Sequence, residues 1–126
     1  MKNPKIRLSF EKGILIVTYE EGAVVDVSDV MEIYDRGFEL SEGKKFCIIF
    51  HTLGQFKVTR EAWDYAVDSP NNERIYAKAY VTDSPESESK AIFHIRMDKP
   101  QLTPMTFWNL KAAKKKMQEI LAKEQS

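Results

Sequence analysis

The residues able to carry nucleophilic, acid–base or metal chemistry are few in this sequence. It holds two histidines and one cysteine, which are His51, His94 and Cys47. Cys47 and His51 stand four positions apart on an expected strand, roughly 13 Å at about 3.3 Å per residue, which is too far to share an ion or a proton. A lone cysteine also excludes an intramolecular disulfide and a multi-cysteine zinc site. We therefore expect no catalytic residue, no metal site and no cofactor.

Phosphate-binding and carboxylate motifs are missing as well. The five glycines, at positions 13, 22, 37, 43 and 54, fit neither a dinucleotide-binding motif nor a P-loop. Glu20 and Glu21 are neighbours on a strand and point to opposite faces, and Glu86 and Glu88 flank a helix start. Neither pair is placed for general acid and base catalysis. The sequence therefore predicts a protein that is not an enzyme.

Three remaining features allow a functional and a structural interpretation. His51 ends the expected central strand, at the edge of the sheet where sites form in open α/β folds, but a strand-end histidine touching water is the simpler interpretation. Trp63 and Trp108 are interpreted as core anchors rather than base-stacking platforms. The lysines of the last helix are interpreted as a solvated face rather than a site for anionic lipid.

Length and charge set broad limits. The chain of 126 residues is 43% hydrophobic and 30% charged, which fits one globular domain over residues 1–126. Nineteen basic and nineteen acidic residues balance. We expect no nucleic-acid partner, because such proteins carry an excess of Lys and Arg. The start MKNPKIRLSF lacks the apolar run of a signal peptide, and no run approaches the length of a membrane span, so a cytoplasmic protein without an integral membrane segment is expected.

The strands are indicated by apolar patterning. Residues 5–10 alternate and residues 14–19 form an apolar run, which together predict an antiparallel hairpin. The apolar run 45–50 predicts a central strand buried on both faces. Residues 74–82 alternate, with Ile75, Ala77, Ala79 and Val81 expected on one side and Tyr76, Lys78 and Tyr80 on the other. Residues 105–108 predict a short strand. Residues 20–26 are ambiguous, and Ala23, Val24 and Val25 could form a short strand after Gly22.

Helices are expected between these strands. Apolar stripes predict helices at about 28–40, 60–68 and 109–123, the first capped by Asp26 or Ser28 and the second by Thr59. Ser84-Pro85-Glu86 marks the start of a further helix, which Lys99-Pro100 ends. The order predicts an α/β fold with a mixed, largely parallel sheet of about four to five strands, an N-terminal hairpin and about four helices.

Three segments of the chain carry a family resemblance. They are GILIVTYEEGAVVDVSDVMEI at 13–33, IYAKAYVTDS at 75–84 and KAIFHIRMDKPQLTPMTFWNLKAAKKKM at 90–117. Together they resemble the STAS domains, and among these the SpoIIAA-like group of small stand-alone bacterial proteins. The resemblance covers nearly the whole chain and implies a single STAS-like domain.

The resemblance implies a regulatory protein-interaction module without enzymatic activity. Regulatory STAS domains bind a partner protein and are switched by phosphorylating a Ser or Thr at the start of the helix after the central strand. Here Thr59 is the nearest matching hydroxyl, although the family's Asp-Ser pair is absent and Arg60 occupies part of the turn. The expected interaction and phospho-switch face comprises His51, Thr52, Gln55, Lys57, Thr59 and Arg60.

Two alternatives remain open from the sequence. A small-ligand or lipid-binding protein is the second candidate, in which Trp63, Phe93 and Trp108 would line a pocket. A homodimer is also expected to be feasible, because an edge strand such as 5–10 exposes unpaired backbone groups. The protein partner itself is not identified by the sequence.

Overall fold

A five-stranded sheet forms the centre of the molecule. The computed structural model describes residues 2–82 and 105–125. The strands are β1 (Ile6–Glu11), β2 (Ile14–Tyr19), β4 (Phe46–Thr52), β6 (Ile75–Thr82) and β7 (Met105–Phe107), and they lie in the order β1-β2-β4-β6-β7. The pair β1–β2 is antiparallel, and the other neighbours are parallel. The mixed α/β class and the N-terminal hairpin are thus confirmed.

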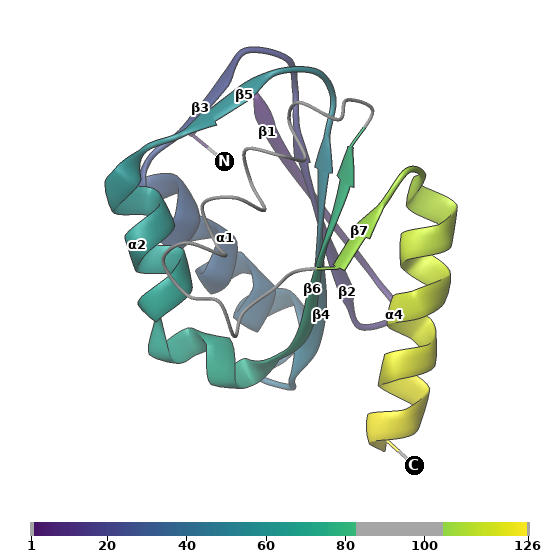
Figure 1. Cartoon of the computed structure of the whole chain (residues 1–126). Coiled ribbons are helices and arrows are strands. Elements are labelled where there is room, and N and C mark those ends of the chain that lie inside the picture. The colour runs from purple at the N-terminus through teal and green to yellow at the C-terminus, as the bar shows by residue number, and fades with distance from the viewer. Residues whose placement is uncertain (1, 83–104, 126) are drawn as a thin grey trace.

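Helices cover both faces of this sheet (Figure 1). Helices α1 (Val27–Leu40) and α2 (Arg60–Asp68) lie on one face, and α4 (Leu110–Gln125) lies on the other. A short 3-10 helix, η1 (Pro70–Arg74), links α2 to β6. Three α-helices are therefore present among the described residues, whereas the further helix expected from Ser84 lies outside them.

The central strand is buried on both sides, as its apolar run predicted. Phe46 and Ile48 pack toward α1, while Cys47 and Ile49 pack toward α4, and all four are fully buried. Strand β2 is buried in the same way. Two apolar cores therefore lie back to back across one sheet, and their burial supplies the main stabilisation of the fold.

A bulge in β6 corrects the expected alternation of residues 74–82. Phe46 pairs with Ile75, but the next residue, Cys47, pairs with Ala77. Ile75 therefore packs in the core of α1 and α2, whereas both Tyr76 and Ala77 pack on the side of α4. The prediction was wrong for Ile75 and Tyr76, because an extra residue on one strand shifts the side-chain phase.

A second sheet of two strands stands at one end of the molecule (Figure 1). Strands β3 (Ala23–Val25) and β5 (Phe56–Val58) pair in parallel, with Val24 opposite Lys57. Strand β5 was not predicted. The helices that follow each strand begin with side-chain caps: Asp26 accepts from the backbone N–H of Asp29, and Thr59 accepts from that of Ala62.

Candidate functional site

The expected interaction face lies around β5 and the start of α2. The hydroxyl oxygen of Thr59 caps α2, because it accepts a hydrogen bond of 3.1 Å from the backbone N–H of Ala62. The residue is half-buried. Arg60 is exposed, and its Nε lies 3.3 Å from Oδ1 of Asp64 one helical turn later. Gln55 and Lys57 are exposed on the same end.

The two candidates on β4 differ in their access to solvent. Thr52 is only 2% exposed, and its hydroxyl donates a hydrogen bond of 3.2 Å to the carbonyl oxygen of Val81 on β6. His51 is half-buried. The fold therefore brings His51, Gln55, Lys57, Thr59 and Arg60 to one end of the molecule. The buried side chain of Thr52 instead links β4 to β6 through its hydrogen bond and is not part of this surface.

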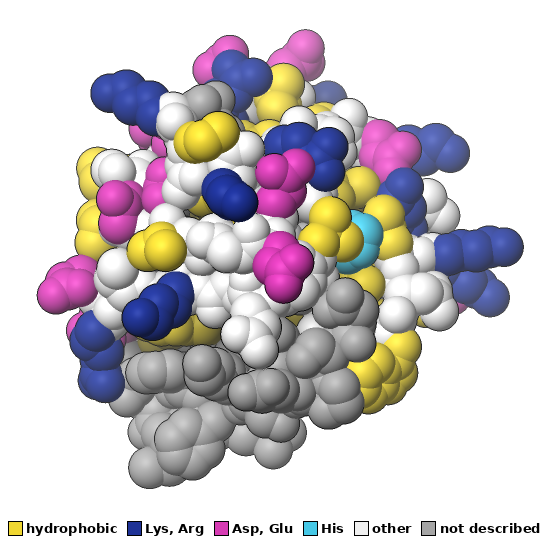
Figure 2. Space-filling model, turned by 90° about the horizontal axis from the view of Figure 1, so that it is seen from above, with side chains coloured by type: hydrophobic (Ala, Val, Ile, Leu, Met, Phe, Trp, Pro, Cys, Tyr) yellow, Lys and Arg dark blue, Asp and Glu magenta, His cyan; other side chains and the backbone are white. Residues whose placement is uncertain are grey.

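Backbone hydrogen bonds bring exposed apolar side chains to the same end. The N–H of Gly22 donates to the carbonyl of Gln55 at 2.7 Å, and the N–H of Thr59 donates to that of Val25 at 3.0 Å. Val24 and Leu53, 54% and 37% exposed, thus join the surface. We call the surface formed by Val24, His51, Leu53, Gln55, Lys57, Thr59 and Arg60 the end face. Figure 2 looks onto this end, where hydrophobic side chains lie among charges of both signs.

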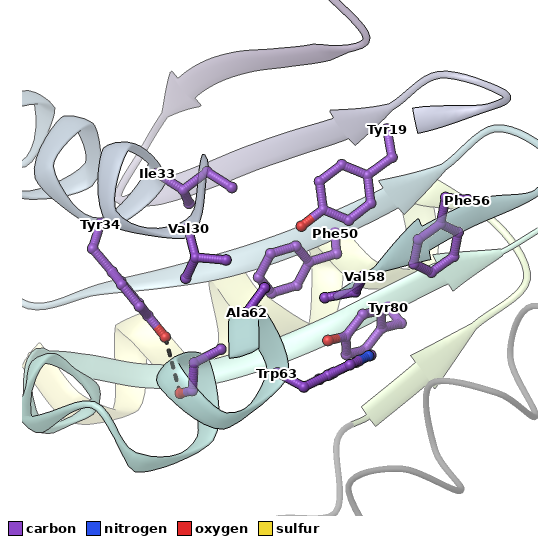
Figure 3. A pocket seen from close by; sticks show the side chains of 11 residues that line it. Tyr19, Val30, Ile33, Tyr34, Phe50, Phe56, Val58, Ala62, Trp63 and Tyr80 are labelled. Atoms are coloured by element: carbon purple, nitrogen blue, oxygen red, sulfur yellow. Dashed lines mark hydrogen bonds between the residues drawn. The ribbon is translucent and has the colours of Figure 1, made fainter. Parts of the chain in front are cut away.

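A cavity lies behind this surface, between the sheet and helices α1 and α2 (Figure 3). Its free interior is about 30 Å³, and the space between its walls, open mouth included, is about 420 Å³. Six elements, β2, α1, β4, β5, α2 and β6, contribute walls that are almost wholly apolar or aromatic. The lining residues are Tyr19, Val30, Ile33, Tyr34, Phe50, Phe56, Val58, Ala62, Trp63, Ala66 and Tyr80.

Stacked rings from neighbouring strands form the sheet side of the cavity. The ring of Phe50 stacks on that of Tyr80 with centroids 5.0 Å apart, and it lies 5.9 Å from the ring of Tyr19. Trp63 of α2 packs against Tyr80. Figure 3 shows the hydroxyl groups of Tyr19 and Tyr80 pointing into the space between these rings and the helices. This arrangement presents two polar groups inside an apolar cavity.

Burial governs the acidity of these tyrosines. The pKa of Tyr19 lies well above its ordinary value, mainly because burial disfavours the phenolate and secondarily because Tyr80 and Tyr34 are close. Burial likewise raises the pKa values of Tyr34 and Tyr80. All three remain protonated at neutral pH.

A polar network adjoins the cavity where α2 ends. Nζ of Lys78 donates to the hydroxyl of Tyr34 at 2.8 Å, and that hydroxyl donates to Oδ1 of Asn72 at 2.9 Å. The amide nitrogen of Asn72 donates to the carbonyls of Ala66 and Val67. Burial lowers the pKa of Lys78 to about 8. The sequence analysis did not find this network, since alternation of residues 74–82 was its sole signal.

The structure separates the other residues considered for chemistry. Cys47 is fully buried on the α4 side of β4, and burial raises the pKa of its thiol to about 11. Trp63 is buried as expected, but Trp108 is 64% exposed, so its interpretation as a core anchor was wrong. Trp108 does not line the cavity, and Phe93 and His94 lie outside the described residues.

The described residues contain neither a metal-ligand cluster nor a helix able to cross a membrane. Among residues 2–82 and 105–125, no group of three or more His, Cys, Asp or Glu side chains is placed to hold a metal ion. None of the helices in that part of the chain has the length and apolar character needed to cross a bilayer.

The sheet order, the helices on both faces and the N-terminal hairpin define an α/β domain of SpoIIAA-like fold. A crystal structure of an uncharacterised protein from the DUF3478 family with a SpoIIAA-like fold, from Shewanella loihica PV-4, matches with a TM-score of 0.56 at 10% identity, over 89% of this chain and 91% of that one. Residues 8–121 match the family described as a domain of unknown function, DUF7793, and the chain belongs to this family. The comparison with curated proteins gave no match. The expected SpoIIAA-like fold is thus confirmed.

Proposed function

We propose that this protein is a non-enzymatic regulatory module of STAS/SpoIIAA-like type that binds a protein partner through the end face. The regulatory role is taken by analogy with the SpoIIAA-like fold, because a fold alone does not define a function. The specific observation is the pairing of β3 with β5, which sets the exposed Val24 opposite Lys57 and close to the exposed Gln55. Apolar side chains ringed by polar and charged ones are the usual composition of a protein-binding surface.

Charge of both signs at the end face favours a protein over a polyanion. Lys57 and Arg60 are exposed there, but Arg60 pairs with Asp64 and Glu61 lies in the first turn of α2. Figure 2 shows Lys and Arg side chains interleaved with Asp and Glu. A mixed pattern gives orientation and specificity to a protein contact, whereas nucleic acid would require a clear basic excess.

We extend the proposal to phosphorylation of Thr59 as the switch. Its hydroxyl lies at the amino end of α2, where backbone N–H groups and the partial positive charge of the helix favour a phosphate. Phosphorylation would replace a neutral cap by a group of about −2 charge. The end face would then differ in charge between the two states, which gives a partner a basis for discrimination.

The experiment is capture of the tagged protein from a lysate of its source organism, with paired variants. Leu53→Glu changes the end face, and Leu40→Glu is the matched control, because both leucines are 37% exposed and Leu40 ends α1. We expect a stoichiometric partner that Leu53→Glu loses and Leu40→Glu retains. Retention by both variants would overturn the end face, and absence of any partner would overturn the interaction role.

The switch is tested with the recovered partner. Thr59→Glu introduces negative charge at the start of α2, while Thr59→Ser keeps a hydroxyl cap. We expect Thr59→Glu to change the affinity at least tenfold and Thr59→Ser to leave it unchanged. Equal affinities of the two variants would remove the switch and leave the interaction module intact.

A homodimer through β1 stays a prediction. The strand is at the edge of the five-stranded sheet, as the expected role requires. Sedimentation analysis of the purified protein distinguishes a monomer from a dimer.

A further inference from the structure

We propose that the outer side of α4, together with the exposed indole of Trp108, docks on an anionic lipid surface. This inference goes beyond the proposed protein-interaction role and uses none of the residues of the end face. It also replaces the interpretation of the lysines of α4 as a merely solvated face, because an exposed tryptophan directly precedes the helix that carries them.

The exposed indole is the first observation. Trp108 follows β7 and is 64% exposed, more than any other exposed large hydrophobic side chain of the described residues. The next residue, Asn109, caps α4, because its side-chain oxygen accepts a hydrogen bond of 2.7 Å from the backbone N–H of Ala112. The indole therefore stands at the amino end of α4. A single exposed apolar side chain is ordinary by itself, so its surroundings decide what it can bind.

Lysines crowd the first two turns of α4. The segment 111–117 holds four lysines and no acidic residue. Lys114 pairs with Glu11 of β1 at 2.6 Å. The other three lysines of this segment form no ion pair with any residue in the described part of the chain. Three uncompensated positive charges are therefore gathered beside the exposed indole.

This placement of charge is unfavourable for the helix itself. The amino end of a helix carries a partial positive charge, so cations in its first turn destabilise it. Lys111 and Lys115 stand at positions i and i+4, where two like charges repel each other. Helix stability thus does not explain these lysines, whereas a negatively charged surface beside them would offset both repulsions.

The free lysines lie on the side of α4 that faces away from the sheet. The buried side of the helix is formed by residues four positions apart, namely Ala113, Met117 and Leu121. At about 3.6 residues per turn, Lys111 and Lys115 stand on the opposite side, and both are exposed. The outer side of α4 is turned away from the sheet in Figure 1, and Figure 2 shows Lys and Arg side chains projecting at the right, where α4 lies. A negative surface can reach them without disturbing either core.

An indole beside free lysines favours a lipid surface over other anions. The boundary between headgroups and acyl chains stabilises an indole, and anionic headgroups attract the neighbouring lysines. A nucleic acid would meet a chain in which nineteen basic and nineteen acidic residues balance, so little beyond this segment would attract it. An acidic protein would have to supply an apolar pocket as well as carboxylates, whereas an anionic bilayer presents both features along its whole surface.

The test measures partition of the purified protein onto vesicles of phosphatidylcholine with about one third phosphatidylserine, by sedimentation of the vesicles at low salt. Vesicles of phosphatidylcholine alone are the control. We expect saturable binding to the anionic vesicles, little binding to the control, and release at high salt, where the charges are screened. Tryptophan emission should shift to shorter wavelength on binding, because Trp108 leaves water while Trp63 is already buried.

Matched variants separate the contributions of charge and indole. Lys115→Glu should lower the partition roughly tenfold without lowering the free energy of unfolding, since it removes a repulsion within α4. Lys44→Glu makes the same change of charge at an exposed residue before β4 and should leave the partition unchanged. Trp108→Ala should lower it roughly fivefold and abolish the emission shift. Met31→Ala removes an exposed apolar side chain from α1 and should change neither quantity.

Three results would overturn the proposal. The first is equal partition onto anionic and neutral vesicles, and the second is partition that neither Lys115→Glu nor Trp108→Ala reduces. The third is retention on immobilised heparin without binding to the vesicles, which would assign the lysines to a soluble polyanion instead of a lipid surface.

Discussion

Nζ of Lys78 on β6 lies 2.8 Å from the hydroxyl oxygen of Tyr34 on α1, and 5.4 Å from the centre of its ring. The hydroxyl of Tyr34 in turn donates a hydrogen bond to Oδ1 of Asn72. The amide nitrogen of Asn72 donates to the carbonyl oxygen of Ala66 in the last turn of α2. A cation near the carboxyl end of a helix is favourable. These contacts join the sheet, α1 and α2 beside the aromatic cavity. They begin at the amine of Lys78, whose pKa is lowered by burial.

The first prediction concerns pH and Lys78. Its pKa is about 8 in the folded state against 10.5 for the free side chain, so between these values the unfolded state binds a proton that the folded state lacks. This contribution to the free energy of unfolding therefore rises from pH 8 to pH 10.5 and is constant below pH 8. The full shift corresponds to about 3 kcal/mol.

The measurement is urea unfolding of the unmodified protein and of Lys78→Met from pH 7.5 to pH 10. We expect the stability of Lys78→Met relative to the unmodified protein to fall by about 1–3 kcal/mol over this range, because the variant has no amine to titrate. Lys57→Met is the control, since Lys57 is exposed. The difference in the free energy of unfolding between this variant and the unmodified protein should not vary with pH. A constant difference for Lys78→Met would contradict the lowered pKa.

The second prediction concerns Gly37 in α1. Replacing an interior helical glycine by alanine ordinarily stabilises a helix by roughly 0.5–1 kcal/mol. At Gly37 an added Cβ would lie 2.5 Å from Cζ and 2.8 Å from Cε2 of the fully buried Phe46. We therefore expect Gly37→Ala to lower the free energy of unfolding by about 1–3 kcal/mol, the usual effect of overpacking.

Chemical denaturation of a double variant checks the cause. Phe46→Leu removes the ring atoms that the new methyl group would meet. Gly37→Ala should then destabilise Phe46→Leu much less than it destabilises the unmodified protein. If alanine stabilises the unmodified protein, α1 lies farther from β4 than the structure places it.

The third prediction concerns the cap of α2. Thr59→Ala removes the acceptor of the Ala62 N–H and should lower the free energy of unfolding by about 1 kcal/mol. Thr59→Ser preserves the oxygen and should be within a few tenths of the unmodified protein. Thermal or urea unfolding measures both. A Thr59→Ala variant of full stability would show that the cap is not formed in solution.

The sequence predicted the elements with strong local signals and missed those that depend on distant partners. The apolar runs at 14–19 and 45–50 are buried strands, and Thr59 caps α2, as expected. Strand β5 has only three residues, and it is a strand because β3 pairs with it. Three residues are too few to show the alternation of apolar and polar side chains by which a strand is recognised in a sequence.

The candidate site was even less accessible to sequence reasoning. The bulge that changes the side of Tyr76 is set by pairing with β4, and the contact of Lys78 with Tyr34 joins residues 44 positions apart. The cavity gathers Tyr19 and Tyr80 from strands separated by β4. Trp108 was expected in the core on its apolar bulk alone, but its place just after β7 leaves it 64% exposed.

The fourth prediction concerns Cys47. The thiol is fully buried between β4 and α4, and burial raises its pKa to about 11, so both access and thiolate formation are suppressed at neutral pH. We expect the folded protein to react with an aromatic disulfide reagent at least a thousandfold more slowly than the protein in 6 M guanidinium, because only the small fraction of transiently open molecules exposes the thiol.

Two variants check which face covers the thiol. Met117→Ala opens the core between α4 and this strand and should accelerate labelling. Ala62→Gly lies on the opposite face and should change the labelling rate only through global stability. Labelling of the folded protein as fast as that of the unfolded chain would show that α4 does not cover β4 in solution, and the back-to-back arrangement of the two cores would be wrong.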